Sequence, residues 1–171
     1  MKALVVGGAA CVWDDLAAAQ ALGEYDAIAA VNDVGAKLEH IDYWCSLHPD
    51  KFPRWLKARS GNKDFELWSH TKAGKLPLHV IDDWGGSSGL FAVRVLLEKG
   101  FTRIVLCGVP LEPTAHFFDT RAWVDCVSYR AAWQRRQPFL SRYVRSMSGW
   151  TRDLLGEPSS DWLETIQPDG L

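Results

Sequence analysis

The chain has 171 residues, of which 47% are hydrophobic and 23% are charged. These proportions are typical of a globular protein, so they exclude extensive disorder and predict one domain with a substantial core. The net charge of −2 provides no general attraction to nucleic acid. Five arginines gather between residues 130 and 145, a local density that is common on a solvated helix face.

The cysteines indicate the cellular compartment. Cys11, Cys45, Cys107 and Cys126 are widely spaced, and none of them forms a CxxC pair. Because three of them lie in or beside apolar runs, we expect buried, reduced thiols and a reducing cytoplasm. The apolar run at the N-terminus is too short for a signal peptide or a membrane span. We therefore expect a cytoplasmic protein with no membrane partner, and the sequence leaves a homo-oligomer open.

Short apolar runs alternate with helical patterns along most of the chain. Strands are predicted over residues 2–6, 26–31, 43–47, 65–68, 78–81, 103–107 and 142–147. Helices are predicted over residues 16–22, 49–59, 88–99, 127–137, 150–155 and 160–166. Asp14 and Asp15 are expected at the cap and first turn of the first helix. This alternation predicts an α/β protein, a Rossmann-like three-layer sandwich with a mainly parallel sheet of six or seven strands.

Two glycine-rich turns indicate a binding site. The first strand ends at Gly7-Gly8, and the segment 85–89, Gly-Gly-Ser-Ser-Gly, opens an apolar helix. Glycine lets the backbone approach a ligand closely, and a helix N-terminus offers unpaired N–H groups to an anion. In parallel sheets such ligands bind beyond the carboxyl ends of the strands. The residues predicted to bind a nucleotide are Gly7, Gly8, Asn32, Asp33, Ser87, Ser88 and Gly89.

Each of these predictions has a structural alternative. The glycines of the first turn could serve only the tight packing of a strand against a helix. Asn32 and Asp33 could cap a turn by bonding to their own backbone. Ser87 or Ser88 could cap the helix that follows, a role that is compatible with anion binding.

The loop over residues 109–120 is expected to act as a lid inside a single domain that spans residues 1–171. It combines prolines with aromatic residues, which suit neither a regular element nor plain solvent exposure. His116 lies in this loop near Glu112 and Asp119, and it is the predicted catalytic base. A helical C-terminal segment is expected over residues 127–171.

Three further residues are expected at the rim of the site: His48, Trp84 and Glu112. Trp84 precedes the second glycine turn and could stack on a base or a sugar. His48, Asp50 and His116 lack the close spacing of zinc ligands, so no metal site is predicted. Mg²⁺ bound together with a nucleotide stays open.

Four motifs add a family resemblance. Val-Gly-Gly follows the first strand, Ala-Val-Asn-Asp ends the second, and Ser-Ser-Gly-Leu begins the apolar helix. Gly-Phe-Thr-Arg-Ile-Val-Leu-Cys-Gly-Val then includes the sixth strand. Together they resemble single-domain bacterial sialyltransferases with a Rossmann-like fold. They are also similar to the related group that contains hydroxymethylpterin pyrophosphokinases, and to small proteins of phages and prophages.

This resemblance implies roles for particular residues. In the sialyltransferases the first glycine turn and the Asn after the second strand contact the nucleotide, the Ser-rich turn lies near the nucleotide sugar, and a His acts as base. The matching positions here are Gly7, Gly8, Asn32, Ser87, Ser88 and His116. The chain has Ala9-Ala10-Cys11-Val12 where that family usually has a Gly-x-Ser-Leu element.

Three functional hypotheses follow. The first is a nucleotide- or nucleotide-sugar-binding transferase, glycosyltransferase-like or pyrophosphokinase-like, whose partner is a small nucleotide ligand. The second is a non-catalytic nucleotide-binding or sequestering module of phage or prophage origin, in which the altered first turn reflects lost chemistry. The third is a structural protein that has kept only the fold.

Overall fold

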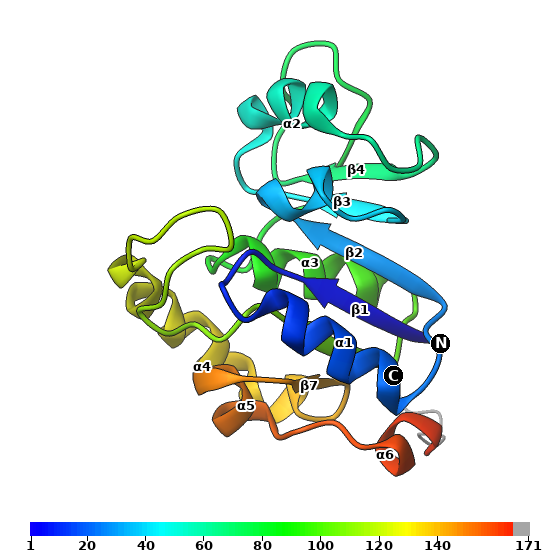
Figure 1. Ribbon diagram of the computed structural model, residues 1–171, viewed down its shortest axis with the longest axis vertical. Helices are drawn as coiled ribbons and strands as arrows, with labels where there is room; N and C mark the ends of the chain where they lie inside the picture. The colour runs from blue at the N-terminus through cyan, green and yellow to red at the C-terminus, as the bar shows by residue number, and fades with distance from the viewer. Residues whose placement is uncertain (166–171) are drawn as a thin grey trace.

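Seven strands form one parallel sheet in the computed structural model, which describes residues 1–165 (Figure 1). The order is β5-β4-β3-β2-β1-β6-β7, and every neighbouring pair is parallel. The strands are β1 (Lys2–Val6), β2 (Ala27–Val31), β3 (Tyr43–Cys45), β4 (Glu66–Ser69), β5 (Leu78–Val80), β6 (Arg103–Cys107) and β7 (Val144–Ser146). The predicted α/β, Rossmann-like fold is confirmed.

Helices cover both faces of the sheet. They are α1 (Val12–Leu22), α2 (Phe52–Ala58), α3 (Ser88–Glu98), α4 (Arg130–Leu140), α5 (Gly149–Leu155) and α6 (Ser160–Glu164). Short 3₁₀ turns occupy Asn32–Ala36, Pro49–Lys51 and Val124–Tyr129. Successive residues of β1 enter opposite cores: Ala3 and Val5 pack with α3 and α4, whereas Leu4 and Val6 pack with α1 and α2. Alternate side chains of a strand point to opposite faces, so this arrangement makes three layers.

The start of α1 differs from the prediction. The helix begins at Val12 with Cys11 at the cap position, so Asp14 and Asp15 lie in the first turn, as predicted, but neither is the cap. Asp15 is buried, and its carboxylate accepts hydrogen bonds from the Gly108 N–H at 2.8 Å and from the Ser148 hydroxyl at 2.6 Å. The carboxylate therefore joins α1 to the ends of β6 and β7, a tertiary role that overrides the local preference for a cap.

Other boundaries differ by a few residues. The strand predicted over 43–47 ends earlier, at Cys45 of β3. The strand predicted over 142–147 is shorter at both ends, as β7. The helix predicted over 127–137 is a 3₁₀ turn followed by α4. Residue 166, the last of the helix predicted over 160–166, lies outside the described residues.

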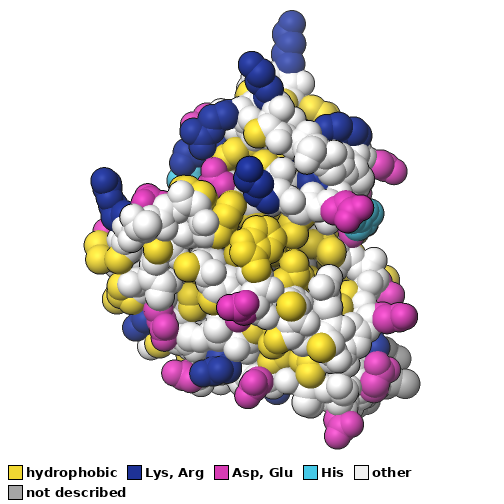
Figure 2. Space-filling model, viewed as in Figure 1, with side chains coloured by type: hydrophobic (Ala, Val, Ile, Leu, Met, Phe, Trp, Pro, Cys, Tyr) yellow, Lys and Arg dark blue, Asp and Glu magenta, His cyan; other side chains and the backbone are white. Residues whose placement is uncertain are grey.

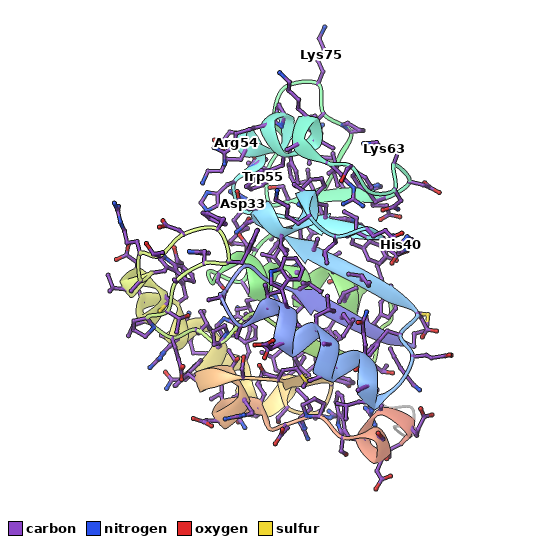
Figure 3. The ribbon with its side chains drawn as sticks, in the orientation of Figure 1. Asp33, His40, Arg54, Trp55, Lys63 and Lys75 are labelled. Carbon is purple, nitrogen blue, oxygen red and sulfur yellow. The ribbon has the colours of Figure 1, made fainter. Side chains whose placement is uncertain are left out.

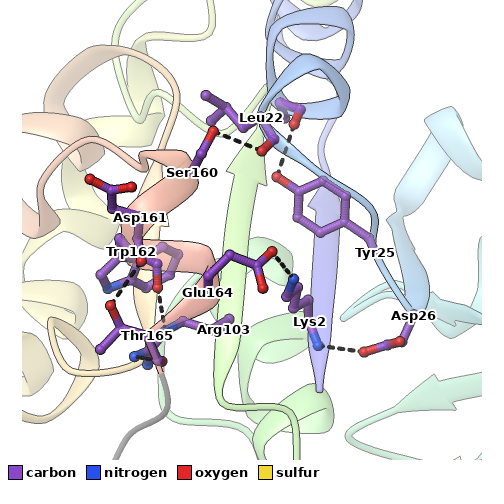
Figure 4. A network of polar contacts seen from close by, with 11 residues as sticks. Lys2, Leu22, Tyr25, Asp26, Arg103, Ser160, Asp161, Trp162, Glu164 and Thr165 are labelled. Atoms are coloured by element: carbon purple, nitrogen blue, oxygen red, sulfur yellow. Dashed lines mark hydrogen bonds and ion pairs between the residues drawn. The ribbon is translucent and has the colours of Figure 1, made fainter.

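The last helix closes the amino-terminal end of the sheet (Figure 4). Ser160 on α6 donates a hydrogen bond of 2.9 Å to the Leu22 carbonyl oxygen, and Glu164 forms an ion pair with Lys2. Arg103 donates to the carbonyl oxygens of Trp162 at 2.8 Å and Thr165 at 2.6 Å. Because Lys2 and Arg103 begin β1 and β6, α6 covers the end of the sheet opposite to the strand ends where ligands bind.

The four cysteines are free thiols, as predicted, and three of them are buried. Within residues 1–165, no helix combines the length and the apolar character needed to cross a membrane.

Candidate functional site

A pocket lies at the carboxyl ends of β1, β2 and β6, where the strand order changes direction. It encloses about 90 Å³. Three of the turns that meet there follow β1, β2 and β6, and the fourth begins α3. The lining residues are Gly7–Ala9, Val31–Asp33, Ser87–Gly89, Gly108–Glu112, Thr114–His116, Phe118 and Trp123. All seven residues predicted to bind a nucleotide, together with His116 and Glu112, are therefore brought to one cavity.

The first glycine turn is tightly packed. A Cβ at Gly7 would lie 2.5 Å from the carbonyl oxygen of Gly108, so close packing alone requires glycine there. The N–H groups of Gly7, Ala9 and Ala10 donate to the carbonyl oxygens of Cys107 (2.8 Å), Gly108 (3.1 Å) and Ala115 (2.9 Å), respectively. These three N–H groups are already paired within the protein. Gly8 is different, because a Cβ there would meet His116 Cδ2 only at 3.6 Å.

Asn32 and Asp33 are held by buried side chains from neighbouring elements. Asn32 has φ of 55°, in the left-handed region that a residue other than glycine occupies at a cost of about 1–3 kcal/mol. Its carbonyl oxygen accepts from Trp44 Nε1 at 2.8 Å, and its Oδ1 accepts from the Ser46 hydroxyl at 2.7 Å. Asp33 Oδ1 accepts from Trp55 Nε1 at 2.8 Å. These contacts leave Asn32 Nδ2 as a donor on the pocket wall.

The serine turn is the N-terminus of α3, and Ser87 is its N-cap, as predicted. Ser87 Oγ accepts from the Leu90 N–H at 3.5 Å and from Trp133 Nε1 at 3.3 Å. Ser88 Oγ accepts from the Leu47 N–H at 3.1 Å. A hydroxyl that accepts keeps its own proton for donation. The two hydroxyls and the first N–H groups of α3 therefore favour an anionic ligand group.

The 109–120 loop contributes residues to the lining of the pocket and is tied to the first glycine turn. His116 pairs with Ala9 in a β-bridge, and the Phe117 N–H donates to the Gly8 carbonyl oxygen at 2.9 Å. The His116 ring stacks on Phe118 at 5.3 Å and contacts Trp123 at 5.6 Å between ring centroids. The loop thus brings the imidazole and the Phe118 ring to the wall of the pocket, and Trp123, just beyond the loop, adds a second aromatic ring.

The carboxylates near His116 are arranged differently from each other. Glu112 lines the pocket, whereas Asp119 is exposed. A hydrogen bond from the Arg121 N–H, at 3.0 Å, is the main cause that lowers the pKa of the Asp119 carboxyl. Within residues 1–165, neither carboxylate forms a hydrogen bond with the His116 ring.

Two residues expected at the rim lie outside the lining. His48 is largely exposed, and the partial loss of water around its ring, followed by the positive charge of Lys51, lowers its pKa. Trp84 lies under the guanidinium groups of Arg94, at 5.5 Å, and Arg136, at 5.1 Å from the ring centroid. These arginines come from α3 and α4, so they occupy the ring that was expected to stack on a ligand.

Leu111 belongs to the stretch after β6 that was expected at the site, but its contact with Arg130 was not predicted. This lining residue has φ of 49°, and its carbonyl oxygen accepts from Arg130 Nε at 3.0 Å and Nη2 at 2.7 Å. Arg130 thereby fixes the start of the 109–120 loop. A local pattern carries no signal for this contact.

The charge of the pocket is negative. Asp33 and Glu112 line it, and no Lys or Arg among the described residues does. Within residues 1–165, no group of three or more His, Cys, Asp or Glu side chains is placed to hold a metal ion.

No protein family, curated protein or solved structure matches this chain. The function must therefore be inferred from the site itself.

Proposed function

We propose that this protein is a transferase that binds a nucleotide or a nucleotide sugar in the pocket at the carboxyl ends of β1, β2 and β6. One observation carries the proposal: the glycine turn, Asn32, the serine turn and His116 lie far apart in the sequence yet line one cavity. Its position at the change of strand order is where open α/β sheets bind ligands. A fold alone would not require polar groups of these kinds to converge there.

The phosphate is assigned to the N-terminus of α3. Ser87 and Ser88 have hydroxyl protons to donate, and the first N–H groups of α3 add partial positive charge. Asn32 Nδ2 is a further donor for the sugar or the base. Because the N–H groups of Gly7, Ala9 and Ala10 are paired within the protein, the first glycine turn would shape the pocket without donating these N–H groups to a phosphate.

His116 is assigned as the base. An acceptor hydroxyl would give its proton to the imidazole, its oxygen would attack the transferred group, and the nucleotide would leave. Such proton transfer contributes typically 10²–10⁴-fold to a rate. Because the described lining residues include two carboxylates and no Lys or Arg, Mg²⁺ would enter only with the ligand phosphates, and residues 1–165 do not form a resident metal site.

The size of the pocket assigns a role to the 109–120 loop. Ligand pockets usually enclose about 300–1,000 Å³, and this cavity encloses about 90 Å³. That space suits one phosphate or one sugar-sized group. A whole nucleotide therefore requires the loop to move away from Gly8 and Ala9, as a lid does.

A second candidate is a non-catalytic nucleotide-binding or sequestering module, and one observation favours it. The N–H groups of the first turn, where the chain departs from the sialyltransferase pattern, are paired inside the protein. In that case the same pocket binds a nucleotide and no group is transferred.

Two measurements decide between these functions. Native mass spectrometry of freshly purified protein would identify a nucleotide that co-purifies. Calorimetry with uridine and cytidine nucleotides, with and without Mg²⁺, would then give affinities, and a transfer assay with nucleotide sugars would give turnover. Binding with turnover supports the transferase, binding without turnover supports the sequestering module, and no binding of any nucleotide contradicts both.

A further inference from the structure

Positive charge is concentrated in one part of this acidic protein. Residues 48–75, here called the basic lobe, contain seven Lys and Arg and three Asp and Glu, whereas the whole chain has a net charge of −2. The lobe includes α2 and the loop between β4 and β5. Dark blue side chains gather at this end of the molecule (Figure 2). The seven cations are Lys51, Arg54, Lys57, Arg59, Lys63, Lys72 and Lys75.

The cations of the basic lobe have different environments. Arg59 is buried, and its guanidinium donates to backbone carbonyl oxygens, among them Leu38 at 2.9 Å. Lys63 donates to the Arg59 carbonyl oxygen at 2.8 Å. Lys51 and Lys75 are exposed, and neither forms an ion pair with a described residue. Among the described contacts of these seven cations, Arg54 alone forms an ion pair with a residue of the pocket.

Arg54 does not line the pocket itself, but it contacts Asp33, which does. Its Nη2 is 3.4 Å from Oδ1 of Asp33, which lines the pocket, and its side chain is 75% exposed. The same carboxylate oxygen already accepts a shorter bond, of 2.8 Å, from the buried Trp55. Asp33 is therefore held in place without Arg54. The exposed guanidinium is free to turn from this weak contact toward a ligand.

Charges of both signs lie near His48, which is outside the lining of the pocket. His48 interacts electrostatically with Lys51, Asp50, His70 and Asp33. Asp33, Arg54 and Trp55 lie together on one side of the molecule (Figure 3). Lys63 lies on the other side of the basic lobe and Lys75 at its far end, away from Asp33.

We propose that Arg54 binds a second anionic group of the ligand at the mouth of the pocket. This inference rests on the proposed nucleotide-binding function and names its ligand class, a nucleotide with a phosphate beyond the first. The N-terminus of α3 would hold one phosphate inside, where none of the described lining residues is Lys or Arg, and the guanidinium would hold the next one outside. A planar guanidinium suits this task because it donates two parallel bonds to a phosphate.

The test is calorimetry with uridine, UMP and UDP, and with the cytidine series in parallel. Arg54→Ala should weaken UDP or CDP binding about tenfold, the typical effect of losing a hydrogen bond to a charged group, and should leave nucleoside binding unchanged. Arg54→Lys should recover part of the loss, because lysine restores the positive charge but not the two parallel hydrogen bonds of a guanidinium. Lys63→Ala and Lys75→Ala are matched controls, since each removes one exposed charge of the same lobe.

The outcomes separate this proposal from the proposed function. If Arg54→Ala binds UDP and CDP as the wild type does, the subsite is wrong and the nucleotide site stands. An equal loss in the Arg54, Lys63 and Lys75 variants would also overturn it, because a diffuse field that attracts polyanions would then explain the binding. If the wild type binds no nucleotide, the proposed function fails and the subsite fails with it. Thermal unfolding of each variant checks that it is folded.

Discussion

The indole N–H of Trp44 donates a 2.8 Å hydrogen bond to the carbonyl oxygen of Asn32, which stands in the left-handed conformation. Trp44 is fully buried and stacks on Trp55 at 6.3 Å between centroids, and Trp55 in turn donates to Asp33. Two core tryptophans thus fix the two residues that follow β2. The packing of α2 is thereby coupled directly to the wall of the candidate site.

Trp44→Phe tests this coupling. The variant keeps an aromatic ring and removes the donor, so the Asn32 carbonyl oxygen loses its partner. We expect the free energy of unfolding to fall by about 1–3 kcal/mol, measured by urea denaturation. Trp13→Phe is the control, because Trp13 is 43% exposed, and it should change stability by less than about 0.5 kcal/mol. Equal effects of the two variants would contradict the role given to Trp44.

Gly7 and Gly8 are adjacent, yet substitution by alanine should have different effects on stability at the two positions. A methyl group at position 7 would lie 2.5 Å from the Gly108 carbonyl oxygen and 2.7 Å from Val109 Cγ2. Gly7→Ala should therefore lower the free energy of unfolding by about 1–3 kcal/mol. Gly8→Ala meets only ordinary contacts, the nearest at 3.6 Å. It should leave stability nearly unchanged and weaken nucleotide binding, because the methyl group would enter the pocket. A strong loss of stability in Gly8→Ala would contradict the open position of this Cβ.

Asp15 provides a third test of stability. Asp15→Asn would disturb the hydrogen bonds from Gly108 and Ser148, and we expect a loss of about 1–3 kcal/mol. Asp14→Asn is the matched control, since Asp14 is exposed on the same turn of α1. Denaturation curves of both variants give the comparison. Asp15 would have no structural role if both curves matched that of the wild type.

Asp15 also illustrates the limit of what the sequence can predict. The strands were predictable because β1 and β6 are buried on both faces and read as continuous apolar runs. The cap at Ser87 was predictable because the preference for serine there is local. The role of Asp15 was not, because its partners Gly108 and Ser148 lie 93 and 133 residues away.

The residues of the candidate site also divide into those that could be predicted from local sequence and those that depend on distant packing. Residues at strand ends converge by topology alone, so Gly8 and Asn32 could be placed in advance. Trp84 could not, because its environment depends on how α4 packs and brings Arg136 over the ring. The arginines expected on a solvated helix face show the same effect: Arg130 lies over Trp150 at 4.9 Å and Arg145 over Trp162 at 5.2 Å.

The thiol of Cys11 should be unreactive at neutral pH. Burial raises its pKa from 9.0 to about 11, so at pH 8 the thiolate fraction is about 100-fold below that of a free thiol, and reaction with a disulfide reagent should slow accordingly. The folded pKa lies above the unfolded one, so the stabilising contribution is complete below pH 9 and is lost as pH rises toward 11. Thiol titration in buffer and in urea checks this. Rapid modification of Cys11 in the folded protein would contradict it.

His116 is the residue on which the transferase proposal depends most. If the imidazole accepts a proton from the acceptor, His116→Ala should lower turnover on the order of 10²-fold or more and leave nucleotide affinity nearly unchanged, because a base acts mainly on the transition state. The His116 ring also stacks on Phe118, so its loss could shift the 109–120 loop. Gly8→Ala tests this effect separately, because the added methyl group contacts His116 and leaves the imidazole in place. His40→Ala is the control, since this exposed histidine pairs with Asp42 outside the pocket. Calorimetry paired with a transfer assay separates the possibilities: lost turnover with retained affinity identifies the base, whereas turnover equal to that of the wild type removes His116 from the mechanism.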